Sequence, residues 1–217
     1  MTHIIGMVSQ KGGSGKSTLA RMMAREFTVG GFAAKIADLD TQQQTCTYWA
    51  GRRAENGIMP EIQVQSFASV KTALAEAPRF DALIMDGKPN ASEQTHEIAR
   101  VADLTVIPTG QTLDDLHPGV VLAHGLRKKG IAVDRIVFAL FKTTGSARES
   151  LAAREYLLQA GYAVLDGIVP VSTAYGSAAD VGRAITETSY RSLNQRAVIL
   201  AQALIDKMAE LSERSVT

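Results

Sequence analysis

The chain has 217 residues, of which 46% are hydrophobic and 21% charged, close to the averages of globular domains. These values exclude wholesale disorder, and the length favours a single domain spanning residues 1–217. Lys and Arg number 23 against 22 Asp and Glu, so the net charge of +1 argues against a globally basic nucleic-acid-binding chain. The single cysteine, Cys46, excludes an internal disulfide and suits a reducing cytoplasm.

The apolar runs and both ends of the sequence argue against export and membrane attachment. The first residues lack the basic segment and long apolar stretch of a secretory signal. No window approaches 18 apolar residues, and the polar segment 210–217 lacks the pattern of an amphipathic membrane anchor. We therefore expect a cytoplasmic protein with no membrane partner.

Short apolar runs alternate with segments of helical period along the chain. The predicted strands are His3–Val8, Ala34–Leu39, Ile62–Phe67, Ala82–Met85, Leu104–Pro108, Ile136–Leu140 and Val164–Val169. The predicted helices are Ser17–Val29, Thr45–Asn56, Ser69–Ala77, Ser92–Ala102, Leu113–Lys129 and Ala147–Ala160. This alternation predicts an α/β fold: a doubly wound, mostly parallel sheet with helices on both faces and right-handed crossovers.

The region 172–217 shows no strand pattern. Its apolar residues repeat at spacings of 4, 3, 4, 4 and 3, which places them on one face of a helix. They are Leu193, Ala197, Leu200, Leu204, Met208 and Leu211. We expect a helical C-terminal region that packs against the domain.

The segment 11–18, KGGSGKST, follows the first predicted strand and opens the first predicted helix, which is the context of a phosphate-binding loop. Gly12, Gly13 and Gly15, with Ser14 between them, allow a tight turn that exposes backbone N–H groups to phosphate oxygens. The N-terminus of the following helix adds the positive end of its dipole. The alternative is an ordinary glycine-rich turn.

Three side chains at the end of this segment are expected to contact the nucleotide and its metal. Lys16 should reach the β- and γ-phosphates, and the Ser17 hydroxyl should ligate Mg²⁺. Thr18 is expected to donate to the α-phosphate. The alternative for the lysine is a solvent-exposed position on the turn.

The loop departs from the standard G-x-x-x-x-G-K spacing, because Gln10 stands where the first glycine belongs and Lys11 precedes the double glycine. This K-G-G-x-x-K-[ST] pattern resembles the deviant Walker A motif of the ParA/MinD family of P-loop ATPases. In that family the first lysine crosses to the phosphates of the partner subunit in an ATP-bound sandwich dimer. The resemblance assigns this catalytic role to Lys11, beside Lys16; the alternative is an exposed loop lysine.

Asp38 and Asp40 end the second predicted strand and point to one side of it. The resembled family has D-x-D-P-Q here, with Thr41 replacing the proline in this chain. The resemblance implies that Asp40 orients the attacking water and that Asp38 lies near the Mg²⁺ shell. The alternative is that either carboxylate caps the following turn or helix.

Asp86 ends an apolar strand in the form of a Walker B motif, in which the carboxylate holds Mg²⁺. Lys88, two residues later, is unusual beside a metal site and receives no role. Because ligands bind at the carboxyl edge of parallel sheets, the loop and all three aspartates should meet there.

Two later stretches also match the family. Residues 104–115 resemble a segment that approaches the nucleotide and the dimer face, although Asp114 or Asp115 would equally suit the N-terminus of a helix. Pro170 opens the segment that the resemblance places beside the adenine.

The histidines, the aromatic residues of 48–49 and most basic residues are expected to have structural or surface roles and not catalytic ones. His3, His96, His117 and His124 have no mutual metal-binding spacing. Trp49 and Tyr48 are expected in core or interface packing. The basic residues of 52–53, 127–129 and the C-terminal region read as solvated helix faces, or as DNA-contacting residues on a dimer.

The resemblance implies a short ParA-type ATPase with ATP and Mg²⁺ as cofactors and slow intrinsic turnover. The implied partners are a second copy of the chain, nonspecific DNA, and a ParB- or ParG-like adaptor that stimulates hydrolysis. We expect plasmid or chromosome segregation, with nucleoid association in the ATP-bound state and no N-terminal helix-turn-helix. Open alternatives are positioning of a protein cargo, a MinD-like membrane-associated ATPase, a small-molecule kinase or ligase, and a non-enzymatic switch.

Overall fold

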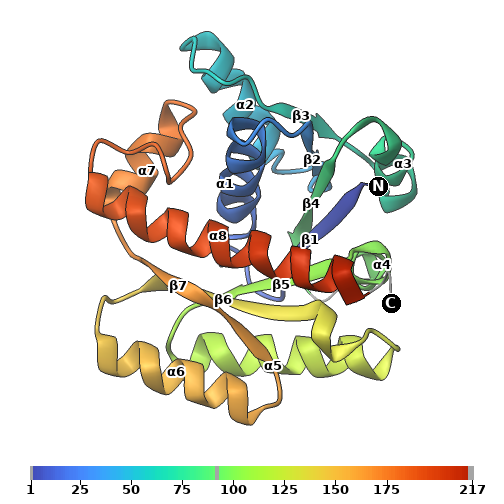
Figure 1. Ribbon diagram of the computed structural model, residues 1–217, viewed down its shortest axis with the longest axis vertical. Helices are drawn as coiled ribbons and strands as arrows, with labels where there is room; N and C mark the ends of the chain where they lie inside the picture. Colours follow the sequence, from blue (N-terminus) through green and yellow to red (C-terminus); the bar gives the residue numbers. More distant parts are fainter. Residues whose placement is uncertain (1, 91–92, 215–217) are drawn as a thin grey trace.

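The computed structural model describes residues 2–90 and 93–214 (Figure 1). Its strands are β1 (His3–Ser9), β2 (Ala34–Asp38), β3 (Gln63–Ser66), β4 (Ala82–Pro89), β5 (Leu104–Thr109), β6 (Ile136–Thr143) and β7 (Ala163–Pro170). Within the described residues they form one seven-stranded sheet in the order β3-β2-β4-β1-β5-β6-β7, and every neighbouring pair is parallel. The predicted doubly wound parallel sheet is confirmed.

The α-helices lie between and after the strands. They are α1 (Lys16–Val29), α2 (Thr45–Glu55), α3 (Val70–Leu74), α4 (Glu93–Val101), α5 (Leu113–Lys128), α6 (Ala147–Gln159), α7 (Thr173–Asp180) and α8 (Arg191–Arg214). Short 3₁₀ turns occupy Ala77–Arg79 and Val133–Arg135. The start predicted for the fourth helix, Ser92, and the tail 215–217 lie outside the described residues.

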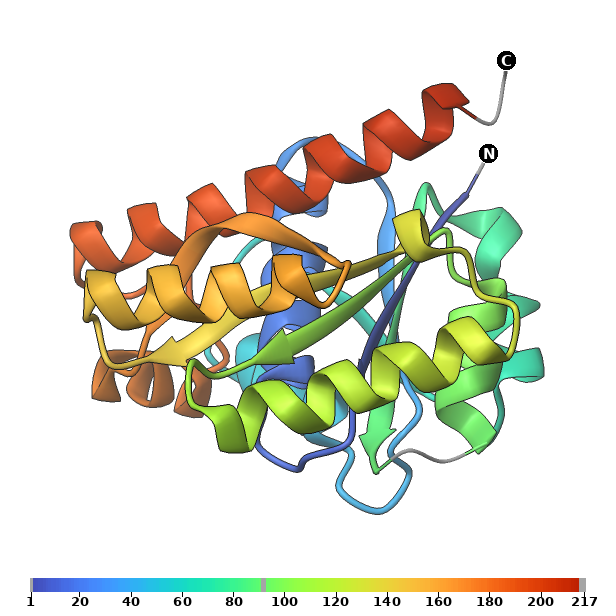
Figure 2. The ribbon, with the colours of Figure 1, turned by 90° about the horizontal axis from the view of Figure 1, so that it is seen from below.

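The helices cover the two faces of the sheet in separate layers, each with its own apolar core (Figures 1 and 2). One face is packed by α1, α2, α7 and α8, and the other by α3, α4, α5 and α6. Because both faces are covered, the central strands are mostly apolar; all six residues of β5 are buried, including two threonines.

Helix α8 closes the first of these layers and runs across β7 and α1 (Figure 1). Ala197, Leu200, Leu204 and Met208 are buried on its inner face, as the helical spacing predicts. Removing these side chains from water stabilises the packing by about 1.5–3 kcal/mol for each large residue. No helix in the described part of the chain is long and apolar enough to cross a membrane.

Three elements end three or more residues from the predicted bound, and one of them, β6, continues from Leu140 to Thr143. The helix predicted over 69–77 ends at Leu74, because Pro78 has no N–H to donate to the Leu74 carbonyl, and the chain continues as a 3₁₀ turn over Ala77–Arg79. Strand β4 continues past Asp86 to Pro89, because Pro89 still pairs with Ser9 of β1 after an irregular step in the register.

Candidate nucleotide-binding site

The carboxyl ends of β1, β2 and β4 bring the predicted phosphate and metal residues to one edge of the sheet. The three strands are neighbours, and Asp38 of β2 stands opposite Asp86 of β4 in the parallel register. The loop that follows β1 leads directly into α1. The fold therefore places the loop and the carboxylates where open α/β sheets bind ligands.

The phosphate-binding loop is built on left-handed glycines. Gly13 has φ 71° and Gly15 has φ 113°, values that L side chains rarely adopt. A Cβ on Gly15 would also collide with the ring of Phe141, which packs under the loop. Two small hollows, of about 90 and 170 Å³, lie along Gly12 and Gly13. The glycine requirement inferred from the sequence has a steric cause at both positions.

Among the described residues, the N-terminus of α1 has no side-chain cap and the loop holds a hydroxyl without a partner. Helix α1 begins at Lys16 after Gly15, so no side chain caps its N-terminus and no acidic residue lies in its first turn. The Ser14 hydroxyl is buried and has no hydrogen-bond partner among the described residues. Unsatisfied donors at a helix N-terminus suit a bound phosphate.

Lys16 is buried beneath this loop, 6% exposed, and its Nζ lies 3.4 Å from the Lys11 carbonyl oxygen. Burial lowers its pKa, and the negative charges of Asp86 and Asp40 oppose that shift. A partly desolvated ammonium in this position would gain from contact with a phosphate.

Asp86 lies fully buried at the centre of the site, 1% exposed. Burial raises its pKa to about 6, although the neighbouring side chains of Ser17 and Cys46 act in the opposite direction. The Cys46 thiol donates to Asp86 Oδ2 at 3.2 Å, while Oδ1 has no hydrogen-bond partner within the described residues. An orphaned, buried carboxylate oxygen beside Ser17 fits the expected position of a Mg²⁺ ion or its water.

The Asp38 carboxylate caps helix α2. Its Oδ2 accepts from the backbone N–H groups of Cys46 and Thr47 and from the Thr47 hydroxyl, all at 3.0 Å. The capping interpretation therefore describes this residue in the free chain, and its assignment to the Mg²⁺ shell stays a prediction.

Asp40 makes a tight local turn with its side chain at the rim of the larger hollow. Its Oδ1 accepts from the N–H groups of Gln43 at 3.1 Å and Gln42 at 3.3 Å. Asp40 also lines that hollow together with Lys16 and Ser17. This geometry agrees with a turn-forming residue, and the role of orienting water stays a prediction.

Lys11 points away from the buried site. Its Nζ lies 3.0 Å from Asp115 Oδ1 near the start of α5, and the two side chains are 44% and 39% exposed. Thr112 donates to the other carboxylate oxygen of Asp115 at 3.1 Å. Residues 104–115 thus reach the loop through Asp115, which the sequence pattern did not separate from Asp114.

Pro170 and Lys142 come to the same edge from the other half of the sheet. Pro170 ends β7 opposite Thr143, and its contact with adenine stays a prediction. Lys142, in β6, donates through Nζ to the Gly13 carbonyl at 2.7 Å. The sequence analysis did not predict this contact between Lys142 and the loop.

The predicted metal residues do not form a protein cage on their own. Among the described residues, no group of three or more His, Cys, Asp or Glu side chains is arranged to hold a metal. Mg²⁺ in nucleotide sites is commonly bound by one or two protein oxygens together with phosphates and waters. The Ser17 hydroxyl and Asp86 fit that donor set, so these residues would hold Mg²⁺ alongside a bound nucleotide.

Outside this edge, the aromatic and basic residues near α2 form a structural cluster. Trp49 is buried and donates its indole N–H to the Arg183 carbonyl at 3.1 Å, and the guanidinium groups of Arg21 and Arg53 lie over its ring. Arg53 is 2% exposed and pairs with Glu187 at 2.7 Å. The solvated-face interpretation is therefore wrong for Arg53.

Comparison with known proteins agrees with the loop and the fold. The model of the CobQ/CobB/MinD/ParA nucleotide-binding domain family matches residues 5–185. A ParA protein of Rhizobium radiobacter is 25% identical over 219 residues, covering 95% of this chain and 98% of the relative.

Solved structures share the same architecture. The MinD protein of Pyrococcus horikoshii complexed with Mg-ADP has a TM-score of 0.77 at 18% identity, covering 96% of this chain and 98% of that one. An ATP complex of a Cyanothece McdA variant has a TM-score of 0.72 at 16% identity, covering 94% and 96%. At these identities the likeness shows the fold.

The parallel sheet, the uncapped glycine loop and the buried Lys16 and Asp86 define a P-loop nucleotide-binding protein. The chain belongs to the CobQ/CobB/MinD/ParA family, and the resemblance to ParA and MinD seen in its sequence is confirmed. By its family, it is a ParA/MinD-type ATPase. The predicted cofactors, ATP and Mg²⁺, agree with the Mg-ADP and ATP bound in the two related structures.

Proposed function

We propose that this chain is a partition or positioning ATPase that binds ATP with Mg²⁺, closes as a homodimer and binds DNA nonspecifically in that state. An adaptor on the cargo then stimulates hydrolysis and releases the dimer. Plasmid or chromosome segregation is the proposed task, and the proposed location is the cytoplasm, on the nucleoid in the ATP-bound state.

The observation that carries the proposal is the position of Lys11. A lysine that served its own subunit's phosphates would be buried beside Lys16, yet Lys11 extends outward to Asp115 at the molecular surface. A surface ion pair of this kind is worth only about 0–1 kcal/mol, so Lys11 leaves it at little cost. An outward-pointing ammonium at the ligand edge is suited to a second subunit that closes over that edge.

The chemistry follows from the charges at the site. Lys16 and the loop N–H groups would hold the phosphates, and Asp40 would orient the attacking water. Negative charge that develops on the transferred phosphoryl group is then only partly compensated by one subunit. Lys11 of the second subunit would supply the missing positive charge, so slow hydrolysis by the isolated chain is expected.

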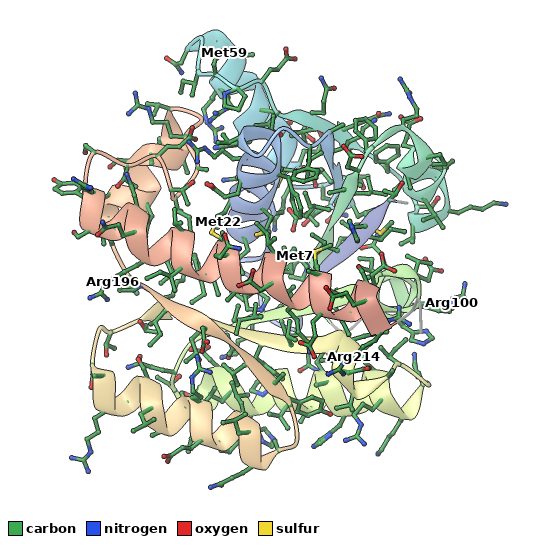
Figure 3. All side chains as sticks on the ribbon, viewed as in Figure 1. Met7, Met22, Met59, Arg100, Arg196 and Arg214 are labelled. Carbon is green, nitrogen blue, oxygen red and sulfur yellow. The ribbon has the colours of Figure 1, made fainter. Side chains whose placement is uncertain are left out.

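A DNA-binding surface is available around the start of α8. Arg183, Arg191 and Arg196 are exposed there, and Figure 3 shows Arg196 at the outer surface of the helix. Further along α8, Lys207 is instead paired with Glu210 at 2.8 Å. Although the chain's net charge is only +1, two copies in a dimer would bring two such basic surfaces to one DNA duplex.

An adaptor is part of the proposal because related proteins act with partners. The MinD protein of Aquifex aeolicus, a structural relative with a TM-score of 0.74 at 12% identity, forms a complex with the cell division protein MinC. In this chain the corresponding partner would be a ParB- or ParG-like protein bound to the cargo.

The test is fluorescence anisotropy with two labelled DNA duplexes of unrelated sequence, measured with ATP, with ADP and without nucleotide. We expect equal binding to both duplexes only with ATP and Mg²⁺, weakening steeply as salt rises. The Asp40→Ala variant should keep the ATP-dependent binding and lose hydrolysis. Binding that ignores the nucleotide, or that depends on sequence, would contradict the proposal.

A further inference from the structure

Lys142 contacts the phosphate-binding loop through a charged side chain that neither the loop motif nor the family resemblance assigns. It comes from β6, on the other side of β1 from the aspartates. Its Nζ lies 2.7 Å from the Gly13 carbonyl oxygen, and its side chain lines both hollows along the loop. The contact joins two segments 129 residues apart in the sequence.

The backbone at Lys142 is unusual for a lysine. Its φ is 59°, in the left-handed region where glycine is favoured. The β6–β7 register is also irregular here: Phe141 pairs with Val169 and Thr143 pairs with Pro170, so β6 carries one extra residue. A bulge of this kind redirects a side chain, and bulges are frequent next to active sites.

Both neighbours of Lys142 fix the bulge in place. Phe141 is buried against Gly15 of the loop, and the Thr143 carbonyl accepts from Val171 N–H at 2.8 Å. The exposed lysine therefore leaves the sheet at a defined point beside the loop. A flexible surface lysine would need none of this support.

Peptide geometry links the Gly13 carbonyl to phosphate binding. In a trans peptide the C=O of one residue and the N–H of the next point in opposite directions. An ammonium that holds the Gly13 carbonyl on one side of the loop therefore holds the Ser14 N–H on the other. The Ser14 hydroxyl, buried and without a partner among the described residues, belongs to the same residue.

We propose that Lys142 is a positioning residue that fixes the Gly13–Ser14 peptide, so that the loop is already shaped for phosphate before the nucleotide arrives. This rests on the proposed use of the site for ATP, and it adds a second lysine that serves the loop from its own chain. Lys142 acts through the loop backbone, which is common to ATP and ADP binding, and not through the γ-phosphate.

The test compares Lys142→Met, Lys142→Arg and Lys142→Gly with the native chain, and uses Lys129→Met as a matched control. Lys129 is an exposed lysine at the end of α5, at the opposite edge of the sheet. Affinities for fluorescent ATP and ADP analogues are measured with Mg²⁺ and without DNA, and hydrogen exchange is followed for the amides of residues 12–18.

We expect Lys142→Met to lower the affinities for ATP and for ADP by the same factor, about tenfold, and to speed amide exchange in the nucleotide-free loop. Lys142→Arg should restore both readouts. Lys142→Gly, which accepts the left-handed backbone, should lose affinity as Lys142→Met does, and Lys129→Met should resemble the native chain. Thermal unfolding checks that each variant is folded.

Several results would overturn the inference. Unchanged affinity and unchanged exchange in Lys142→Met would leave Lys142 without a role at the loop. Loss of ATP affinity alone would assign it to the γ-phosphate instead of the backbone. Failure of the native chain to bind either nucleotide would contradict both the proposed function and this inference. Equal binding by the native chain and by Lys142→Met would contradict only the inference.

Discussion

Lys11 Nζ and Asp115 Oδ1 lie 3.0 Å apart and tie the phosphate-binding loop to the first turn of α5. Both residues belong to the same chain. In the proposed dimer, Lys11 would instead point toward the phosphates of the second chain. The ion pair thus competes with closure, although its partly exposed position makes it a weak competitor.

Replacing Asp115 with Asn should free Lys11 while preserving the shape of the side chain. We expect ATP-dependent dimerisation to strengthen by about two- to fivefold, because the exposed pair contributes at most about 1 kcal/mol. Light scattering across a concentration series measures the change, with the exposed neighbour Asp114→Asn as the control. Weaker dimerisation of Asp115→Asn would instead assign Asp115 a contact in the closed dimer.

The Cys46 thiol is protected by its place beside Asp86. It is fully buried, and burial, reinforced by the charge of Asp86, raises its pKa well above the ordinary value. Reaction with a thiol reagent therefore requires opening of the structure, and we expect labelling of the folded chain about 10³-fold slower than of the unfolded chain. Bound Mg²⁺ and nucleotide should slow it further. Rapid labelling of the folded protein would contradict the burial of this site.

The Arg53–Glu187 pair predicts a pH-dependent contribution to stability. Burial acts to raise the pKa of Glu187, but hydrogen bonds from Arg53 and the Ala184 N–H outweigh it and hold the pKa below its usual value. The stabilisation is complete above the unfolded pKa of about 4.5 and is lost as pH falls through the lower folded pKa.

Glu187→Gln tests this contribution by denaturant unfolding. At pH 7 we expect a loss of about 3–5 kcal/mol in the free energy of unfolding, because the buried Arg53 is left without its charge partner. The difference from the native chain should shrink as the pH falls below about 4.5. The exposed Glu55→Gln serves as the control. A penalty independent of pH would show that the altered hydrogen bonding of the introduced amide matters more than the charge.

Arg191 and Arg196 test the DNA-binding part of the proposal. If each contacts one phosphate, the double variant to Ala should weaken ATP-dependent DNA binding equally for all sequences. The slope of log K against log salt should fall by about 1 for each arginine. Arg79→Ala, an exposed residue beside α3 on the other face of the sheet, is the control. An unchanged salt dependence would move the DNA-binding surface away from the start of α8.

The periodicity and motifs sufficed for the fold and the centre of the site, since both depend on local signals. Apolar runs and glycine spacing located the strands, the loop and Asp86 without tertiary information. The cap made by Asp38, the burial of Arg53 and the partner of Lys11 depend on residues distant in sequence. Lys142 left no signal at all, because a bulge and a left-handed lysine arise from the pairing of β6 with β7.

In the proposed dimer, Lys11 acts on the phosphates of the second subunit. Sedimentation of the Lys11→Ala chain with ATP and Mg²⁺, alongside fluorescent nucleotide binding by the monomer, tests it most directly. We expect this variant to bind ATP nearly as the native chain does and to remain monomeric, while the native chain dimerises. Dimerisation of Lys11→Ala with the same concentration dependence as the native chain would show that Lys11 does not act on the second subunit.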